Sequence, residues 1–411
     1  MDKETLYKWA TDLFPMPRSL TGQGVRDTLT YIKNIIPELE IKSIPSGTKV
    51  FDWEIPKEWV IREAYIKNEH NELILDFKAN NLHVLGYSEP KNAWVDRVEL
   101  ENHLHSLANL PDAIPYRTSY YEKKWGFCIS HNQRMKLKDR RYYVYIDSEQ
   151  IDGGMNYGEL IIEGETNQEI LLSTYICHPS MANDNVSGIV VTMALIKEIL
   201  LKPRKYTYRI LFLPETIGAI AYLSKNLKYM QAVTIAGFVI TCCGNGETYS
   251  LMPSKAGNTL ADKIARCVLS CIKDSKQYLF SDRGSDERQY CSPLVNLPVC
   301  SIMREKYAEY PEYHTSLDNL DFISAQGLYE SVDIYTACLS LLEMNFKPIA
   351  TYPCEANLGK RGLYQSSKNI YKDILAYADG EHDLLDLIEI VGYGEIVVPA
   401  VKILLAEGLL K

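Results

Sequence analysis

The sequence predicts an α/β protein: a three-layer α/β/α sandwich with a mixed, mostly parallel sheet, a small β-rich inserted domain and a C-terminal helical domain. Three observations support this fold class. Strand-like and helix-like stretches alternate between residues 135 and 345, as expected for a sheet covered by helices on both faces. Short strand-like stretches separated by turn residues fill residues 46–129, and amphipathic helical stretches follow residue 346.

In chain order, residues 4–36 read as helical with an interruption at Pro15–Pro17. Turn residues then separate four strand-like stretches of the insertion: Val60–Lys67, Glu72–Phe77, Leu82–Tyr87 and Val95–Leu100. Arg141–Ile146 and Gly158–Glu163 are strand candidates of the sandwich. The predicted domains are therefore residues 1–45 with 130–346 for the sandwich, 46–129 for the insertion and 347–411 for the C-terminal domain.

Composition narrows the classes of partner and compartment. The chain has 411 residues, which favours more than one domain. Its 44 basic and 53 acidic residues give a net charge of -9, which argues against nucleic acid or an anionic membrane as the main partner. The 10 cysteines include no Cys-x-x-Cys pair, and Met1–Lys8 lacks the apolar core of a signal peptide. These features predict a soluble cytoplasmic protein with reduced thiols.

Three segments carry the side chains that best support chemistry: Ile176–Gly188, Leu213–Gly218 and Tyr313–Asp318. His178 and Glu215 each follow an apolar strand-like run, and Asp184 precedes a helix-like stretch. In open α/β sheets, ligands bind outside the carboxyl ends of the strands. Imidazole and carboxylate groups at such ends can hold a cation and deprotonate water, which are the needs of a metallohydrolase.

In this order the segments resemble the motifs of the zinc aminopeptidase family, which includes bacterial leucyl aminopeptidases, glutamate carboxypeptidases and glutaminyl cyclases. The resemblance covers roughly residues 150–345. It implies an aminopeptidase-like catalytic domain in which His178 binds one zinc ion, Asp184 bridges two and His314 binds the other. It also implies that Glu215 is the general base, and Asp318 matches the last residue of the motif that contains His314.

The sequence departs from the family at two metal ligands and at one supporting residue. Thr216 and Thr241 replace carboxylate ligands, and Ser180 replaces the Asp that orients the first His. A hydroxyl is a poor zinc ligand, and the lost charge leaves two adjacent cations less shielded from each other. We therefore predict one zinc ion rather than two, with Thr216 and Thr241 as hydrogen-bonding neighbours. Its expected ligands are His178, Asp184 and His314, helped by Glu215 or Glu287.

Other segments resemble a narrower group: aminopeptidase-like proteins whose genes accompany bacterial surface-polysaccharide biosynthesis genes. This resemblance spans the whole chain and implies a fold and a gene neighbourhood, but no substrate. The segments are Phe14–Gly24, Val50–Trp59, Ile114–Tyr121, Trp125–Cys128 and Arg283–Tyr290.

Four residues are candidates for substrate binding. Glu287 and Arg288 occupy the place of a Ser-Asp-His motif of the family, where Arg288 could bind a substrate carboxylate through two hydrogen bonds. A solvated charged turn is the alternative. Arg304 and Tyr313 precede or flank His314 and are interpreted in the same way.

An aromatic and cationic cluster in the insertion has two readings. It either packs at the domain junction or forms an edge on which a sugar stacks. Its members are Tyr116, Arg117, Tyr120, Tyr121 and Trp125.

The C-terminal region resembles a winged helix-turn-helix. Asp383–Ile390 and Ile396–Leu410 are amphipathic, with a turn at Gly392–Gly394. A helix that reads DNA needs an excess of basic side chains. Here the two lysines, Lys402 and Lys411, are balanced in number by two glutamates, Glu395 and Glu407. A docking or homodimerisation module is therefore favoured over DNA binding.

The sequence as a whole favours a metal-dependent hydrolase that cleaves an amide bond in a small peptide or amino-sugar substrate. Two alternatives stay open. The chain is a catalytically degenerate relative that binds a peptide or glycan, or an assembly or regulatory protein acting through its C-terminal module.

Overall fold

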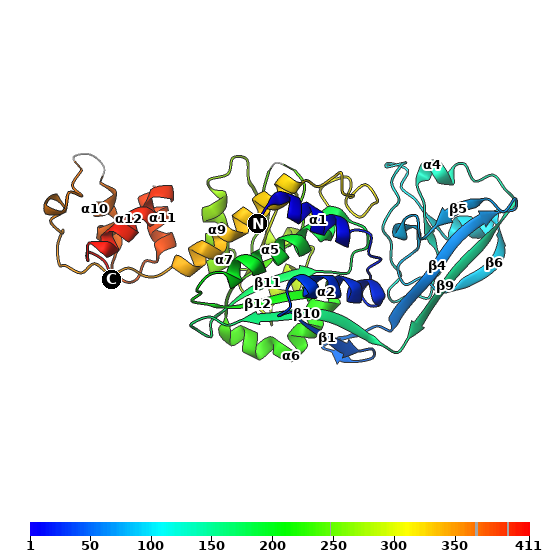
Figure 1. Cartoon of the computed structure of the whole chain (residues 1–411), viewed down its shortest axis with the longest axis horizontal. Helices are drawn as coiled ribbons and strands as arrows, with labels where there is room; N and C mark the ends of the chain where they lie inside the picture. The colour runs from blue at the N-terminus through cyan, green and yellow to red at the C-terminus, as the bar shows by residue number, and fades with distance from the viewer. Residues whose placement is uncertain (247, 366–368, 393) are drawn as a thin grey trace.

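The computed structural model describes residues 1–246, 248–365, 369–392 and 394–411. Three parts lie in a row along the long axis of the molecule (Figure 1). The sandwich is in the middle, a β-rich part is at one end, and a small helical domain is at the other.

The sandwich contains an eight-stranded mixed sheet, as predicted. Strands β12, β11, β13 and β16 run parallel to one another, β10 pairs antiparallel with β12 and with the edge strand β1, and β14 pairs antiparallel with β16. In spatial order the strands are β1 (Glu40–Pro45), β10 (Gly154–Ile162), β12 (Thr207–Leu213), β11 (Glu169–Tyr175), β13 (Thr234–Val239), β16 (Val299–Met303), β14 (Ser250–Met252) and β15 (Lys276–Gln277).

Helices cover both faces of this sheet, which completes the three layers (Figure 1). Both faces need covering because successive apolar residues of β11 point to opposite sides of the sheet. Ile170 and Leu172 enter one hydrophobic core, and Leu171 enters the other. The first core includes side chains of α1 (Lys3–Leu13), α2 (Gln23–Ile35), α5 (Gly188–Leu200), α7 (Leu260–Leu269) and α9 (Ala325–Met344). The second core includes side chains of α6 (Ile217–Val233) and α8 (Glu287–Tyr290).

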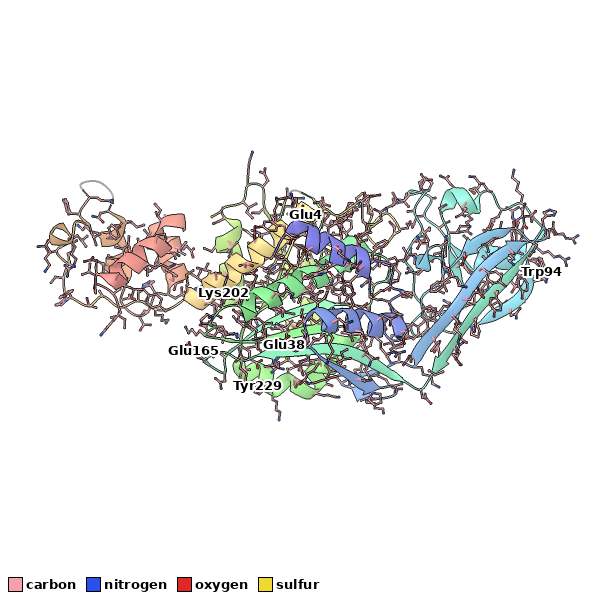
Figure 2. All side chains as sticks on the ribbon, in the orientation of Figure 1. Glu4, Glu38, Trp94, Glu165, Lys202 and Tyr229 are labelled. Atoms are coloured by element: carbon pink, nitrogen blue, oxygen red, sulfur yellow. The ribbon has the colours of Figure 1, made fainter. Side chains whose placement is uncertain are left out.

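The inserted part is built on a second sheet with the strand order β5-β4-β9-β6. Its strands are β5 (Leu73–Asp76), β4 (Glu58–Asn68), β9 (Arg141–Ile151) and β6 (Lys91–Asp96). Because β9 pairs with both β4 and β6, this sheet extends past residue 129, where we placed the end of the insertion. Alternating burial marks β9 as a strand, but such a pattern does not tell which sheet the strand joins. Figure 2 shows Trp94 of β6 at the end of this sheet farthest from the helical domain.

Two of the four strands predicted for the insertion are corrected. Residues 95–100 were expected to be extended, but α3 (Arg97–Asn102) begins after Asp96, whose Oδ1 accepts a hydrogen bond from the Glu99 backbone N–H at 2.8 Å. Residues 82–87 contain part of a 3-10 helix, η1 (Asn81–His83), followed by single bridges at Val84 and Gly86. Short elements complete the insertion: β2 (Lys49–Val50), β3 (Trp53–Glu54), β7 (Leu104–His105), β8 (Phe127–Cys128) and α4 (His131–Arg134).

The C-terminal domain consists of helices that pack on one another through apolar faces, as the sequence predicts. They are α10 (Ile370–Tyr377), α11 (Leu384–Val391) and α12 (Gly394–Ala406). Leu387, Val397 and Leu404 are fully buried. The predicted turn at Gly392–Gly394 includes Tyr393, which lies outside the described residues. None of the described helices is long and apolar enough to cross a lipid bilayer.

Strand β12, which leads into Glu215, is fixed to its neighbours by a buried charge cluster. Arg209 Nε and Nη2 donate to the two carboxylate oxygens of Glu169 at 2.7 and 2.8 Å, and Nη1 donates to Glu159 at 3.3 Å. All three residues are buried. The cluster therefore joins β12 to β10 and β11 at the end of the sheet opposite the site.

Replacing Arg209 by Met is expected to lower the free energy of unfolding by about 3–5 kcal/mol, because it leaves the buried carboxylate of Glu169 without its counter-charge and leaves Glu159 with Lys42 alone. Urea unfolding followed by circular dichroism measures the change. Arg62→Met is the control, since Arg62 is 50% exposed beside Asp147, and the expected loss there is below about 1 kcal/mol. Equal losses in the two variants would contradict the argument.

Candidate active site

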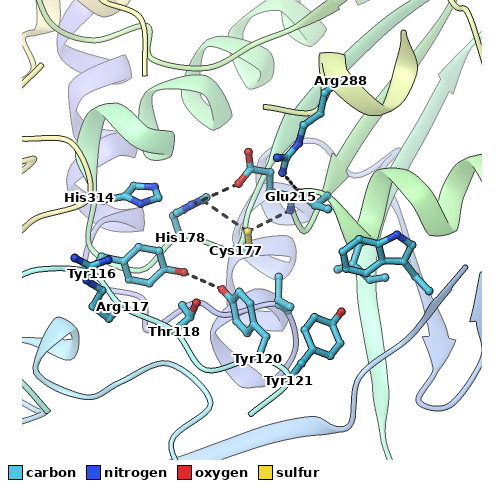
Figure 3. Close-up of a pocket in the computed structure, with 14 residues that line it drawn as sticks. Tyr116, Arg117, Thr118, Tyr120, Tyr121, Cys177, His178, Glu215, Arg288 and His314 are labelled. Carbon is cyan, nitrogen blue, oxygen red and sulfur yellow. Dashed lines mark hydrogen bonds and ion pairs between the residues drawn. The ribbon is translucent and has the colours of Figure 1, made fainter. Parts of the chain in front are cut away.

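The candidate site is a cavity of about 410 Å³ beyond the carboxyl ends of β11 and β12 (Figure 3). The sandwich contributes His178, Glu215, Arg288 and His314 to its wall. The insertion contributes aromatic side chains: Trp53, Tyr116, Tyr120 and Tyr121. The site therefore lies between the two parts of the chain, as expected for the crevice at strand ends.

The structure brings the three predicted metal ligands together. One ligand atom each from His178, Asp184 and His314 lies within 4.8 Å of the others. Asp184 Oδ2 and His314 Nε2 are 3.1 Å apart, yet both are shielded from solvent and neither makes a hydrogen bond within the described part of the chain. Zinc bonds of 2.0–2.2 Å in a tetrahedron set ligand atoms about 3.4 Å apart, so a small inward movement fits this set to one ion.

Burial prepares His178 for such a role. It lowers the pKa of His178 to about 4, so the ring is neutral at pH 7. Neutral imidazole is the form that binds a metal.

Hydrogen bonds from distant segments fix the ligand candidates in place. Asp318 accepts the backbone N–H groups of Asn183 at 2.6 Å and Asp184 at 2.9 Å. Buried Arg18 donates from Nε to the His178 carbonyl at 2.8 Å. The His314 carbonyl accepts the Tyr116 N–H at 2.7 Å, which connects the insertion to a ligand candidate. The final residue of the predicted His-containing motif, Asp318, therefore positions the segment that carries Asp184.

Glu215 follows β12 and faces the same group of side chains. Its Oε2 lies 3.7 Å from His178 Nε2, and its side chain is 22% exposed. Burial, together with the nearby carboxylates of Asp286 and Asp184, holds the pKa of Glu215 well above its usual range, and Arg288 opposes the shift. A carboxyl group with a raised pKa can accept and return a proton near neutral pH.

The two threonines at the lost ligand positions are both hydrogen-bonded. Arg288 Nη2 donates to Thr216 Oγ1, and the Thr216 N–H donates to Asp286 at 2.7 Å. Thr216 has φ of 64°, which is rare for a β-branched residue and is typical of functional sites. Thr241 Oγ1 lies 2.6 Å from the Tyr175 hydroxyl, which also donates to Asp184 Oδ1.

Of the predicted substrate-binding residues, Arg288 lines the cavity (Figure 3). Glu287 does not join the three metal-ligand candidates. It is fully buried, and its Oε1 accepts from the N–H groups of Gly284 and Ser285 at 2.9 and 3.1 Å. These bonds close the turn before α8, so its role in the structure is to shape that turn.

Arg304 is corrected, because its guanidinium is used inside the sandwich. Nε donates to the Asn245 carbonyl at 2.6 Å, and Nη1 donates to Tyr249 and Glu330 at 2.9 and 2.7 Å. Tyr313 stacks on the His314 ring with centroids 3.9 Å apart. Neither residue is part of the cavity lining, so Tyr313 orients a ligand candidate rather than reaching the cavity.

The aromatic cluster of the insertion is divided by the structure. The Tyr116 ring meets the rings of His178 and His314 edge-on at 5.4 and 5.2 Å. Trp125 stacks on His103 at 3.7 Å, away from the cavity lining. Trp53 lines the cavity instead of Trp125. It is 41% exposed, and its ring lies 6.0 Å from that of Tyr121.

Sequence reasoning missed Trp53, Arg18 and Tyr175. The signal for Tyr175 was its place at the end of a buried strand, three residues before His178.

Comparison with known proteins decides the family. A family model described as a domain of unknown function, DUF4910, matches residues 7–345. The chain belongs to this family. A second model, described as a winged helix-turn-helix, matches residues 348–411, in agreement with the resemblance of the C-terminal helices.

Similar proteins confirm the predicted aminopeptidase-like fold. A Clostridium acetobutylicum protein, provisionally named a polysaccharide biosynthesis protein with an aminopeptidase-like domain, is 43% identical over 93% of this chain and 90% of its own. A crystal structure of a provisionally assigned peptidase from that organism superposes with a TM-score of 0.95 at 41% identity, covering 100% of this chain and 96% of its own. The zinc aminopeptidase of Bacillus subtilis has a TM-score of 0.60 at 13% identity, covering 83% and 95%, and shares the fold.

Proposed function

We propose that this DUF4910 protein is a zinc-dependent hydrolase that cleaves an amide bond in a small peptide or amino-sugar substrate. The observation that carries the proposal is the pair of buried atoms Asp184 Oδ2 and His314 Nε2, which lie 3.1 Å apart beside His178 and Glu215 and have no hydrogen bond among the described residues. Buried polar atoms in proteins are nearly always satisfied, so an orphaned pair on metal-liking side chains favours a bound cation. One ion, held by His178, Asp184 and His314, accounts for both atoms.

The roles of the residues follow from their positions. Bound there, a zinc ion would polarise the amide carbonyl and make a neighbouring water more acidic. Glu215 would accept the proton of that water and return it to the leaving amine. Tyr116 and Tyr313, which pack against the ligand imidazoles, would hold the two rings in place. Cys177 accepts the Glu215 N–H at 3.2 Å and fixes the backbone of the base.

The substrate class is inferred from the rest of the cavity wall. Arg288 lines the cavity, and its Nε is shielded from solvent and makes no hydrogen bond among the described residues, so a small movement of the side chain would bring an unused donor to a substrate carboxylate. The exposed rings of Trp53 and Tyr121 at the cavity offer apolar faces that suit the C–H groups of a sugar or an apolar side chain. The name of the 43% identical relative favours a substrate in polysaccharide biosynthesis.

Replacing Arg288 by Lys should raise KM about tenfold for a carboxylate-bearing amide and leave kcat within about twofold. The reason is that an ammonium group cannot make the two parallel hydrogen bonds that a guanidinium makes to a carboxylate. Arg283→Lys is the matched control, since Arg283 lies five residues earlier and is exposed outside the cavity lining. Steady-state kinetics measure both variants. A fall in kcat with unchanged KM in Arg288→Lys would contradict a substrate-binding role.

The direct experiment is a hydrolysis screen on aminoacyl amides, dipeptides and N-acylated amino sugars. Protein stripped with a chelator is compared with the same protein after one equivalent of zinc is returned. Zinc-dependent release of amine supports the proposal. Cleavage that is equal in stripped and reloaded protein would overturn it.

A second candidate function is a binding protein that has lost catalysis, and the observation that favours it is the replacement of two carboxylate ligands by Thr216 and Thr241. Such a protein would bind the same compounds in calorimetry without turning any of them over. Zinc-dependent turnover in the screen would exclude it.

A further inference from the structure

We propose that the hydroxyl of Tyr175 takes the place of a second metal ion and so limits this site to one ion. The inference rests on the proposed zinc site and specifies how the chain sets the number of ions. It concerns a residue that the family motifs do not mark.

Tyr175 contacts the three side chains that a second ion would need. Its hydroxyl donates to Asp184 Oδ1 and lies 2.6 Å from Thr241 Oγ1. Its ring meets the His178 ring edge-on, with centroids 5.0 Å apart. The shared carboxylate and the position of a lost carboxylate ligand therefore flank the phenolic oxygen, and the imidazole packs against the ring that carries it.

Packing keeps the hydroxyl in this place. Tyr175 is the last residue of β11, pairs with Leu213 of β12, and is 2% exposed. Rotation of the ring about its long axis does not move its hydroxyl, because the oxygen lies on that axis. A cation could enter only if the whole side chain left a close-packed core, and cores offer few such vacancies.

The hydrogen-bond inventory leads to the same result. A Tyr hydroxyl has one proton to donate, and here it goes to Asp184 Oδ1. Asp184 Oδ2 then remains as the oxygen that faces His314 Nε2 at 3.1 Å and has no hydrogen bond in the part of the chain that the structure describes. Tyr175 thus divides the carboxylate into one oxygen satisfied by the protein and one available to a single ion.

Charge also disfavours a second ion. Thr216 and Thr241 are neutral, so Asp184 is the one charged residue among the five family ligand positions. Arg288 adds a positive charge where it donates to Thr216. Two cations that close together would face little negative charge from their ligands.

The test is a gain of metal rather than a loss. At a fixed free zinc concentration in equilibrium dialysis, the wild type and Thr241→Asp should each bind one equivalent, because Tyr175 still fills the position in the single variant. Tyr175→Phe combined with Thr241→Asp should bind two. The matched control is Tyr290→Phe combined with Thr241→Asp. It removes another buried phenolic hydroxyl, which is hydrogen-bonded to Ser173 at 2.9 Å, and should leave the number of bound zinc ions at one.

A second pair guards against misfolding of the carboxylate variant. Thr241→Cys changes the volume little and offers a thiolate, which gives Co²⁺ a strong near-ultraviolet absorption band. An increase in this band over the wild type is expected in Tyr175→Phe/Thr241→Cys and not in Thr241→Cys alone. Circular dichroism checks the fold of every variant.

The outcomes separate this inference from the proposed function. Two equivalents of zinc in Thr241→Asp alone, or no gain in either folded double variant, would overturn the role of Tyr175. A wild type without zinc would instead count against the proposed hydrolase. The difference between each double variant and its single variant tests Tyr175 whatever the wild-type count is.

Discussion

Replacing Glu215 by Gln is expected to lower kcat for amide hydrolysis by roughly 10²–10⁴-fold, the usual contribution of a positioned general base. Gln keeps the shape of the side chain but cannot accept a proton at neutral pH. Glu215 Oε2 lies 3.7 Å from Nε2 of the ligand candidate His178, but Glu215 does not belong to the group of three ligand candidates. The variant should therefore keep its zinc and bind substrate with a KM within a few-fold of the wild type.

Kinetics and zinc content measured on the same preparation check this prediction. Glu309→Gln is the control, because Glu309 is exposed in the segment that leads to His314 and is not part of the cavity lining. Its kcat should not change. Full activity in Glu215→Gln would show that proton transfer runs through another group.

Replacing Asp184 by Asn should weaken zinc binding by more than about 100-fold, the upper end of what the loss of a supporting group costs. The reason is that Asp184 is the one carboxylate among the three ligand candidates and is almost fully buried. Asn removes that charge and offers a single neutral oxygen in its place. Calorimetric titration of the stripped protein with zinc measures the affinity.

Asp318→Asn provides the graded comparison for Asp184→Asn. Asp318 touches the backbone of Asn183 and Asp184 rather than facing the proposed ion, so a loss of about 10–100-fold is expected there. A larger effect in Asp318→Asn than in Asp184→Asn would contradict the assignment of Asp184 as the ligand.

The sequence alone predicted those site residues that lie at the ends of strands. His178, Glu215 and Asp184 each adjoin an apolar strand or helix, and parallel strands bring their carboxyl ends to one edge of the sheet. The same periodicity could not assign β9 to its sheet, because alternation gives the face of a strand and not its neighbour. Strand order depends on contacts between residues far apart in the chain.

Long-range hydrogen bonds explain the remaining differences. In the sequence, Arg288 and Arg304 look like equivalent charges near the site. In the structure, the guanidinium of Arg304 donates hydrogen bonds to the main-chain carbonyls of residues 245 and 246. Tyr175 gains its role from Thr241, 66 residues later, and this partnership leaves no local pattern. Trp53 reaches the cavity from the short hairpin of β2 and β3, whose two-residue strands carry almost no periodic signal.

The most direct test of one ion held by His178, Asp184 and His314 is a crystal of zinc-loaded protein measured on both sides of the zinc absorption edge. We expect a single anomalous peak about 2.0–2.2 Å from one atom of each of these three side chains. Two peaks on either side of Asp184, or no peak within bonding distance of the three residues, would contradict the account.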